Sequence, residues 1–176
     1  MAKNSEAPRK ERAEKEHRRE KPQSEFQEKV LHVNRCSKVV KGGRKFSFSA
    51  IILVGDGKGR VGYGFAKANE LTDAIRKGGE AARKNLIQCP LEGTTIPHEL
   101  TVQWDGATIF LKPAPKGTGV IAGSMPRAIL EMAGYKDVMA KNMRSRNPIN
   151  QVKATFRALE LLVPRDELRQ RRGAVT

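Results

Sequence analysis

The sequence predicts an α+β fold made of two small domains, and three observations lead to that prediction. In the first half, strand-like alternation occupies three consecutive stretches before the spacing becomes helical. In the second half, a hairpin pattern precedes a helix, a short strand and another helix. A chain of 176 residues is long enough to bury a core in each half.

The net charge of +15 points to a polyanionic partner, because 34 lysine and arginine residues stand against 19 acids. Nucleic acid and an anionic membrane surface are the two candidates. No run of about 18 apolar residues exists to span a bilayer, and the charged amino terminus lacks the apolar core of a secretory signal. Aromatic residues make up only 5% of the chain, which argues against extensive base stacking.

Residues 1–24 form a charged tail with eight basic and five acidic residues and almost no apolar ones. Such a segment cannot offset the entropy of ordering, so we expect it to be disordered in isolation. It is either a solvated tail or an arm that folds onto RNA.

The first half reads as three strands. Phe26–Asn34 is a strand with Leu31 and Val33 on one face, and Gly42-Gly43 is a hairpin signal that leads into Phe46–Val54. Asp56–Gly59 is a tight turn, and the third strand places Gly62, Gly64 and Ala66 on one face. That face of small residues fits either the packing of the following helix or a close approach of RNA.

A helix is predicted from Leu71 to Gln88, because apolar or small residues recur every three or four positions, at Leu71, Ile75, Gly78, Ala82 and Leu86. A second face carries Arg76, Lys77, Arg83 and Lys84. It is either a solvated face or, beside basic loops, an RNA contact. Pro90 ends the segment.

The second half begins with a hairpin of Leu100–Trp104 and Ala107–Leu111 around Asp105-Gly106. The glycine-containing loop Pro113–Gly123 leads to a helix that Ser124 can cap and Gly134 can stop. A loop of this kind at a helix amino terminus is a natural anion site.

The rest of the second half supplies a basic strand and a last helix. Asp137–Arg146 is predicted to be a short strand whose end is basic, at Lys141, Arg144 and Arg146. Asn147-Pro148 starts a helix whose buried stripe is Ile149, Val152, Phe156, Leu159 and Val163. We expect residues 166–176 to be a frayed, basic tail.

Enzyme chemistry is not indicated. Gly57-x-Gly59-x-x-Gly62 matches a dinucleotide fingerprint only formally, because its last glycine lies in a strand and not at a helix start. The histidines His17, His32 and His98 and the cysteines Cys36 and Cys89 lack metal-ligand spacing. The carboxylates stand singly. The sequence predicts no catalytic site, metal or cofactor.

Several motifs in order resemble the bacterial small-subunit ribosomal protein S five family from about Glu25 to Val163. They are Val-Asn-Arg at 33–35, Val-Lys-Gly-Gly-Arg at 40–44, Val-Gly-Asp-Gly at 54–57, Gly-Arg-Val-Gly at 59–62, Gly-Thr-Gly at 117–119, Ile-Ala-Gly at 121–123 and Asn-Pro-Ile-Asn at 147–150. The chain departs from the family pattern in its longer lead-in, in the basic stretch Asn142–Arg146 and in Ser124-Met125-Pro126.

The resemblance implies a double-stranded-RNA-binding-like domain at 25–88, three strands on one helix, and a two-layer ββαβα domain at 91–165. It implies a structural role in the cytoplasmic ribosome, with binding to small-subunit rRNA where body meets head and effects on head orientation. It further implies contacts with proteins S four and S eight, proximity to the mRNA entry path, and decoding accuracy shared with S four and S twelve. The loop Ser37–Arg44 would correspond to the family's rRNA-contacting hairpin, beside the spectinomycin region.

The candidate RNA-contacting residues are cations and glycines of the loops, the first helix and the basic strand end. They are Arg35, Ser37, Lys38, Lys41, Gly42, Gly43, Arg44, Lys45, Arg60, Lys67, Arg76, Lys77, Arg83, Lys84, Lys116, Gly117, Thr118, Gly119, Lys141, Arg144, Arg146 and Asn147. Of the two glycine-rich loops in the first half, Ser37–Arg44 is the preferred contact, and Gly55–Arg60 is read mainly as a turn. The alternative functions are a structured-RNA-binding protein outside the ribosome and a nucleotide-dependent enzyme; no membrane partner or small-molecule substrate is expected.

Overall fold

Two four-stranded sheets organise the chain in the computed structural model, which describes residues 26–171 and 173. The predicted tail at 1–24 lies outside the described residues. The first half contains β1 (Gln27–Val40), β2 (Gly43–Gly55), β3 (Arg60–Ala68), α2 (Leu71–Lys84) and β4 (Leu86–Gln88). The second half contains β5 (Leu100–Trp104), β6 (Ala107–Pro113), β7 (Val120–Ile121), α3 (Ser124–Ala133), β8 (Val138–Asn142), α4 (Pro148–Glu160) and α5 (Arg165–Arg171).

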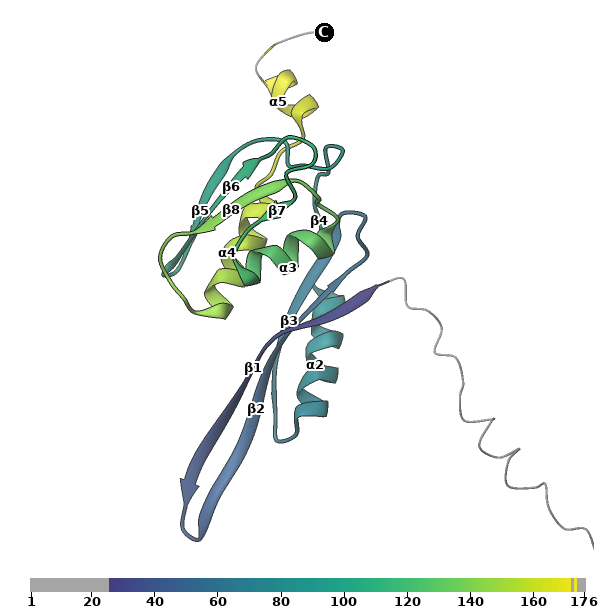
Figure 1. The fold of residues 1–176 in the computed structure, drawn as a ribbon. Coiled ribbons are helices and arrows are strands. Elements are labelled where there is room, and N and C mark those ends of the chain that lie inside the picture. Colours follow the sequence, from purple (N-terminus) through teal and green to yellow (C-terminus); the bar gives the residue numbers. More distant parts are fainter. Residues whose placement is uncertain (1–25, 172, 174–176) are drawn as a thin grey trace, which may run out of the picture.

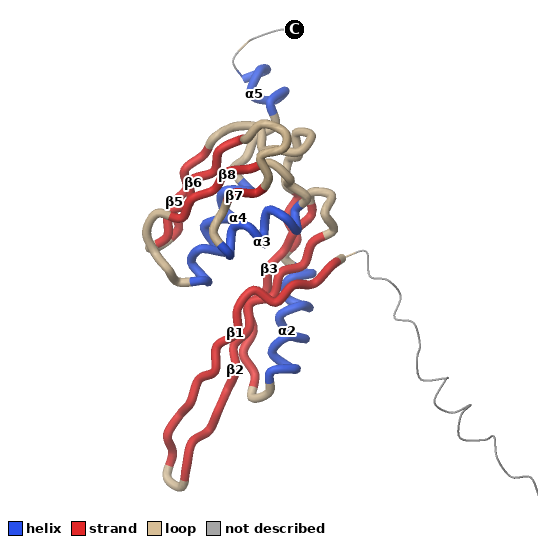
Figure 2. The backbone as a smooth tube through the Cα atoms, in the orientation of Figure 1, coloured by secondary structure: helices blue, strands red, loops and turns tan. Residues whose placement is uncertain are grey.

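The first sheet is antiparallel in the order β1-β2-β3-β4, with α2 packed on one face (Figure 1). β1 and β2 form a long two-stranded ribbon that extends beyond the end of α2 (Figure 2). The predicted strand Phe26–Asn34 therefore continues to Val40. The expected loop Ser37–Arg44 is mostly strand, since only Lys41 and Gly42 separate the paired residues Val40 and Gly43.

The first helix is shorter than the sequence predicted. It ends at Lys84, where the Asn85 amide donates to the carbonyls of Ala81 and Ala82. Leu86–Gln88 then pairs with β3 as β4, so pairing with a distant strand overrides the helical spacing at Leu86. Leu71, expected in the buried stripe, is 37% exposed.

The small-residue face of β3 is covered by α2. A Cβ on Gly62 would collide with the backbone carbonyl of Ala82, and one on Gly64 with that of Gly78. Of the two interpretations of this face, helix packing is therefore the correct one, and RNA has no access to it.

The second sheet has the order β5-β6-β8-β7, and α4 packs against β5 and β6. β7, missed by the sequence, pairs in parallel with β8. The predicted ββαβα order is otherwise confirmed. Residues 165–171 form the helix α5, so the described part of the expected frayed tail is ordered as a short helix.

The two halves share a core, whereas the sequence suggested that the second half had its own. On the α2 side of the first sheet, Ala50, Ile52 and Val54 pack against Ala74 and Ala82. The opposite face joins the core of the second half, which includes residues of α3, α4 and the second sheet; its members include Ile51, Leu53, Val61, Ile109, Leu111, Ile129, Leu130, Val152, Phe156 and Leu159. The first sheet is therefore enclosed between α2 and the second half.

Candidate nucleic-acid interface

The tip of the β1–β2 ribbon is a two-residue turn that projects from the body (Figure 1). Gly42 has φ +100°, a conformation that side chains rarely adopt, so glycine is required there. No atom lies within 4 Å of the place where a Cβ on Gly42 or Gly43 would stand. The backbone at the tip is therefore open to a ligand.

The ribbon is a concentrated source of positive charge. Residues 29–55 contain no aspartate or glutamate, and Lys38, Lys41, Arg44 and Lys45 form no ion pair within the described chain. Lys38 stands directly across from Lys45 in the strand register. Because like charges directly opposite each other destabilise a ribbon, this arrangement favours binding of an anion between them.

Arg35, also on the ribbon, is held by an aromatic ring. Its guanidinium carbon lies 3.8 Å from the centroid of the Phe46 ring. This contact orients the charge near the ribbon's surface without neutralising it. Ser37 is exposed and pairs with Phe46 across the strands.

The basic face of α2 is less free than the sequence suggested. Arg76 lies 3.6 Å from Asp73 and 3.1 Å from Glu80, and Arg83 lies 2.9 Å from Glu28 of β1. Lys77 and Lys84 are exposed and form no ion pair among the described residues. Exposed pairs of this kind contribute little to stability, so RNA can displace them, but α2 presents fewer free cations than the ribbon.

The second glycine-rich turn of the first half, Asp56–Gly59, faces the second half of the molecule. Gly57 N donates to Met132 O at 3.1 Å and Gly59 N to Ala133 O at 2.9 Å. These are carbonyls at the end of α3, which a helix leaves without internal partners. The turn therefore caps α3 across the two halves, and its glycine amides are not free for a phosphate.

Asp56 holds this turn together from within. Its Oδ1 accepts from the amides of Lys58 at 2.8 Å and Arg60 at 3.0 Å, and its Oδ2 accepts from Arg60 Nε at 2.7 Å. Burial alone would raise the pKa of Asp56, but these hydrogen bonds outweigh it and hold the pKa below its usual value. Arg60 is thereby paired, which weakens its candidacy for RNA.

The Gly-Thr-Gly loop is also satisfied from within the protein. Asp137 Oδ1 accepts from Gly117 N at 2.9 Å and Gly119 N at 3.0 Å. The hydrogen bond from the Gly119 backbone amide is the largest of the causes that lower the pKa of Asp137, and the hydrogen bond from the Thr94 hydroxyl is the next largest. The prediction that this loop is an anion site is therefore wrong for these amides, since a carboxylate of the protein already occupies them.

The helix after that loop starts differently from the prediction. Gly123 is the N-cap of α3 and no side chain caps the helix, so Ser124 is its first residue and not its cap. Thr118 Oγ1 donates to Pro115 O at 2.8 Å. Lys116 remains exposed at the loop's surface, while Gly134 ends α3 with φ +99°, as predicted.

The basic stretch after β8 is held rigidly. Asn142 Nδ2 and Gln151 Nε2 both donate to Ser145 O, at 2.7 Å and 3.1 Å. Asn147 Oδ1 accepts from Ile149 N at 3.1 Å and so caps α4. This confirms the predicted helix start, and the side-chain oxygen of Asn147 is already used in this hydrogen bond. Arg144 and Arg146 are exposed on this loop, and Lys141 is exposed on β8.

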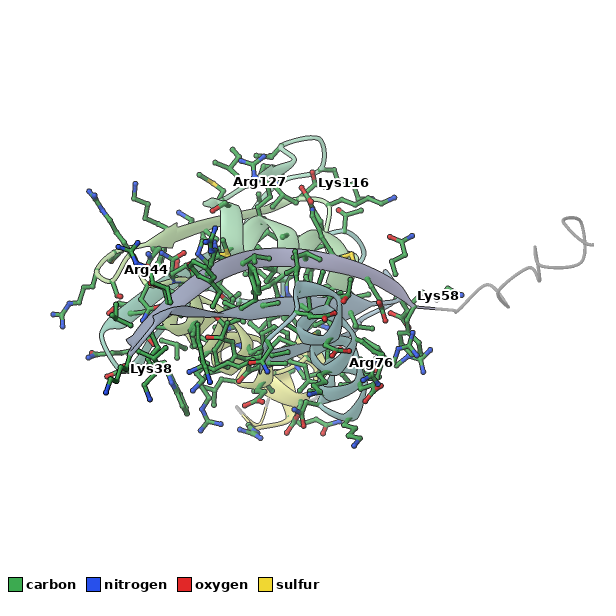
Figure 3. All side chains as sticks on the ribbon, turned by 90° about the horizontal axis from the view of Figure 1, so that it is seen from below. Lys38, Arg44, Lys58, Arg76, Lys116 and Arg127 are labelled. Atoms are coloured by element: carbon green, nitrogen blue, oxygen red, sulfur yellow. The ribbon has the colours of Figure 1, made fainter. Side chains whose placement is uncertain are left out.

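The candidate cations fall into separate groups and do not converge on one site. In the view of Figure 3, Lys38 and Arg44 lie on the ribbon, and Lys116 and Arg127 appear on another side of the molecule. Arg76, and Lys58, which was not among the predicted contacts, appear at the end of the view away from Lys38 and Arg44. Arg127 was not among the predicted RNA contacts, because a single arginine in an apolar helix forms no basic pattern in the sequence. Its guanidinium donates to Ala122 O at 3.0 Å. The ribbon is the group with the most unpaired charge.

Two family models match the chain over most of its length. One, described as "Ribosomal protein S5, N-terminal domain", matches residues 26–90. The other, "Ribosomal protein S5, C-terminal domain", matches residues 102–172. The chain belongs to the ribosomal protein S5 family.

Curated relatives of S5 type agree over nearly the whole chain. A protein of Protochlamydia amoebophila named "Small ribosomal subunit protein uS5" is 76% identical over 98% of this chain and 99% of its own length. Proteins of the same name from Chlamydia pneumoniae and Chlamydia trachomatis serovar D are 67% and 64% identical, each covering 87% of this chain and 93% of the relative.

S5 is a family of structural ribosomal proteins and not of enzymes, in agreement with the sequence. Across residues 26–171 and 173, no group of three or more histidine, cysteine or acidic side chains could hold a metal ion. None of the helices described is long and apolar enough to cross a membrane.

Proposed function

We propose that this S5 chain is a structural constituent of the small subunit in the cytoplasmic ribosome and binds small-subunit rRNA chiefly through the β1–β2 ribbon. The observation that carries the proposal is the unneutralised charge of Lys38, Lys41, Arg44 and Lys45 on a segment without acids. Phosphates are the ligands that such charges select, and glycine at the tip lets an RNA backbone come close. The names of the relatives support the ribosomal location.

The proposed mechanism is positional. Contacts to phosphates fix where a protein sits, and the shape of folded RNA supplies the specificity. Other exposed cations on separate parts of the surface add to the positive charge; they are Arg35, Lys67, Lys77, Lys84, Lys116, Lys141, Arg144 and Arg146. Seven further candidates are already engaged inside the protein and contribute less; they are Arg60, Arg76, Arg83, Gly117, Thr118, Gly119 and Asn147.

The finer parts of the proposal follow from family membership. They are a position where body meets head, stabilisation of head orientation, contacts with proteins S four and S eight, proximity to the mRNA entry path, and a contribution to accuracy with S four and S twelve. The proposed domains are 25–88 and 91–165, flanked by tails at 1–24 and 166–176. The family matches at 26–90 and 102–172 support the division into two domains.

A salt titration of binding to small-subunit rRNA tests the proposal. If about eight phosphates are neutralised, log affinity falls with log salt at a slope near −6 to −7, at roughly 0.7–0.9 per contact. The double variant Lys41→Ala and Arg44→Ala lowers this slope by about 1.5 and leaves the thermal unfolding temperature unchanged. A flat titration of the wild-type chain would refute the proposal.

A further inference from the structure

An apolar groove lies where the first sheet meets α4. It has a volume of about 430 Å³ and is lined by Ile51, Tyr63, Phe65, Ile149, Val152 and Lys153. Ile51 and Phe65 face each other across β2 and β3, and the α4 residues stand at helical spacing on the opposite wall. We call this cavity the β3–α4 groove.

The groove contains an exposed aromatic ring. Phe65 is 39% exposed, and the Lys67 ammonium lies 5.7 Å from the centroid of its ring. Deeper in the groove, Tyr63 packs on Phe156 with ring centroids 4.6 Å apart. The exposed face of one ring with a cation beside it is the arrangement on which nucleobases stack.

The groove also offers a hydrogen-bond donor. Burial, and then the charge of Glu160, raise the pKa of Tyr63, so its hydroxyl stays protonated. No acceptor within the described chain takes that hydroxyl. The Glu160 carboxylate is held by Arg157 at 3.1 Å, which limits its repulsion of an anionic ligand.

A row of polar and cationic residues runs from the groove to the ribbon tip on the same face. The strand register places Asn34 opposite Ser49, Cys36 opposite Ser47, and Lys38 opposite Lys45, while Lys67 stands opposite Ser49 on the other side. Residues directly opposite share a face, so these residues continue the face that carries Ile51 and Phe65. At about 3.4 Å per residue, the row from Phe65 to Lys38 spans about 20 Å. We call it the inner face of the ribbon.

This inner face contains no carboxylate and several cations, so its positive charge suits the phosphates of an RNA backbone. We propose that an unpaired nucleobase of the bound RNA inserts into the β3–α4 groove and stacks on Phe65, while the adjoining backbone follows the inner face past Lys67 toward Lys38 and Lys45. The proposal rests on the proposed function. It adds a base-contacting site to a protein whose other candidate contacts are to phosphates.

Photo-crosslinking of the full chain bound to small-subunit rRNA tests this placement. Trypsin cleaves after lysine and arginine, so it releases most of the groove's wall in two peptides. They are Val61–Lys67, which contains both aromatic rings, and Asn147–Lys153 from α4. After ultraviolet irradiation and nuclease digestion, mass spectrometry is expected to find a nucleotide adduct on Val61–Lys67. Adducts confined to peptides of the ribbon tip, or a protein crosslink at Val61–Lys67 in the assembled subunit, would overturn the proposal.

Substitution gives a second readout. Phe65→Ala is expected to weaken rRNA binding at least fivefold, because stacking on an aromatic ring contributes about 1–3 kcal/mol per base, and to abolish the adduct. Trp104→Ala is the matched control, since Trp104 is also 42% exposed but lies on β5, outside the ribbon and the groove; it should retain the adduct on Val61–Lys67. Unchanged affinity of a folded Phe65→Ala variant contradicts the base site alone, whereas absence of salt-dependent binding by the wild-type chain contradicts the proposed function.

Discussion

The two glycine-rich turns of the first half look alike in sequence but differ in what surrounds them. Both are basic, and both connect antiparallel strands. At the ribbon tip, nothing surrounds Gly42 and Gly43. At Asp56–Gly59, the backbone amides are bonded to α3 and the side chain of Asp56 closes the turn. The same composition thus supplies an open ligand-facing tip in one place and a structural joint in the other.

The difference teaches that glycine and charge do not by themselves define a phosphate loop. Such a turn can bind phosphate only if its backbone amides and cations are not already bonded to other groups of the protein. Around Asp56 the glycine amides are bonded to α3 carbonyls, and the Arg60 side chain is paired with the carboxylate of Asp56. Near the ribbon tip, Lys38, Lys41, Arg44 and Lys45 have no acidic partner within the described chain, so their charge is available to RNA.

The largest effect is expected where the joint meets α3. Gly134 has φ +99°, and a Cβ there would collide with the backbone carbonyl of Gly57. Gly134→Ala should therefore lower the free energy of unfolding by about 3 kcal/mol, from a left-handed conformation and backbone overlap together. Urea denaturation followed by circular dichroism measures this; a loss below about 1 kcal/mol would mean that the two halves are not tightly joined.

A matched pair of glycines separates surroundings from conformation. Gly59 and Gly42 have nearly equal φ, +97° and +100°. A Cβ on Gly59 would stand 3.0 Å from Cys89 O, whereas one on Gly42 meets nothing. We expect Gly42→Ala to cost about 1 kcal/mol and Gly59→Ala about 2–3 kcal/mol. Equal losses in urea denaturation would show that the Asp56–Gly59 turn is as open as the tip.

The carboxylate of Asp56 gives the joint a pH dependence that the tip lacks. Its pKa is lowered in the folded state, so its contribution is present above the unfolded value of about 3.9 and is lost as pH falls below it. Asp56→Asn should cost about 1–2 kcal/mol at neutral pH.

The stability deficit of the Asp56→Asn variant relative to the wild-type chain should shrink as pH falls below about 4, where the Asp56 carboxylate begins to lose its contribution. Asp137 also has a lowered pKa, so the wild-type chain and the Asp56→Asn variant both lose some stability on acidification. Only the difference in stability between them reports on Asp56. Thermal unfolding of both proteins across this range provides the measurement. A constant difference would contradict the role given to the carboxylate.

Local patterns predicted much of this fold. The alternation from Phe46 to Val54, the Gly42-Gly43 turn, and the Asn147-Pro148 helix start depend on neighbours in sequence, and all three were confirmed. The end of α2 was mispredicted, because the pairing of Ile87 with Val61 is a long-range contact that no local period reveals.

The candidate site was predicted less completely for the same reason. The Gly117 and Gly119 amides bind Asp137, about twenty residues farther along the chain, and the Gly57 amide binds Met132 in the other half. Both contacts turn an apparent anion site into internal structure. The β3–α4 groove likewise joins residues of β3 and α4, so the sequence analysis did not predict it.

The shared core has a consequence for how the chain is made. Ile51, Leu53 and Val61 are synthesised early, with the first half of the chain. The residues of the core cluster that bury them extend as far as Leu162 and are synthesised later. At a synthesis rate of about 5–20 residues per second, the roughly one hundred intervening residues take about 5–20 s. Over that interval the nascent chain presents an apolar sheet face to the cytosol. A chain released early, at about residue 90, would keep that apolar sheet face exposed. Incomplete synthesis would therefore yield a fragment that tends to aggregate and that chaperones would bind.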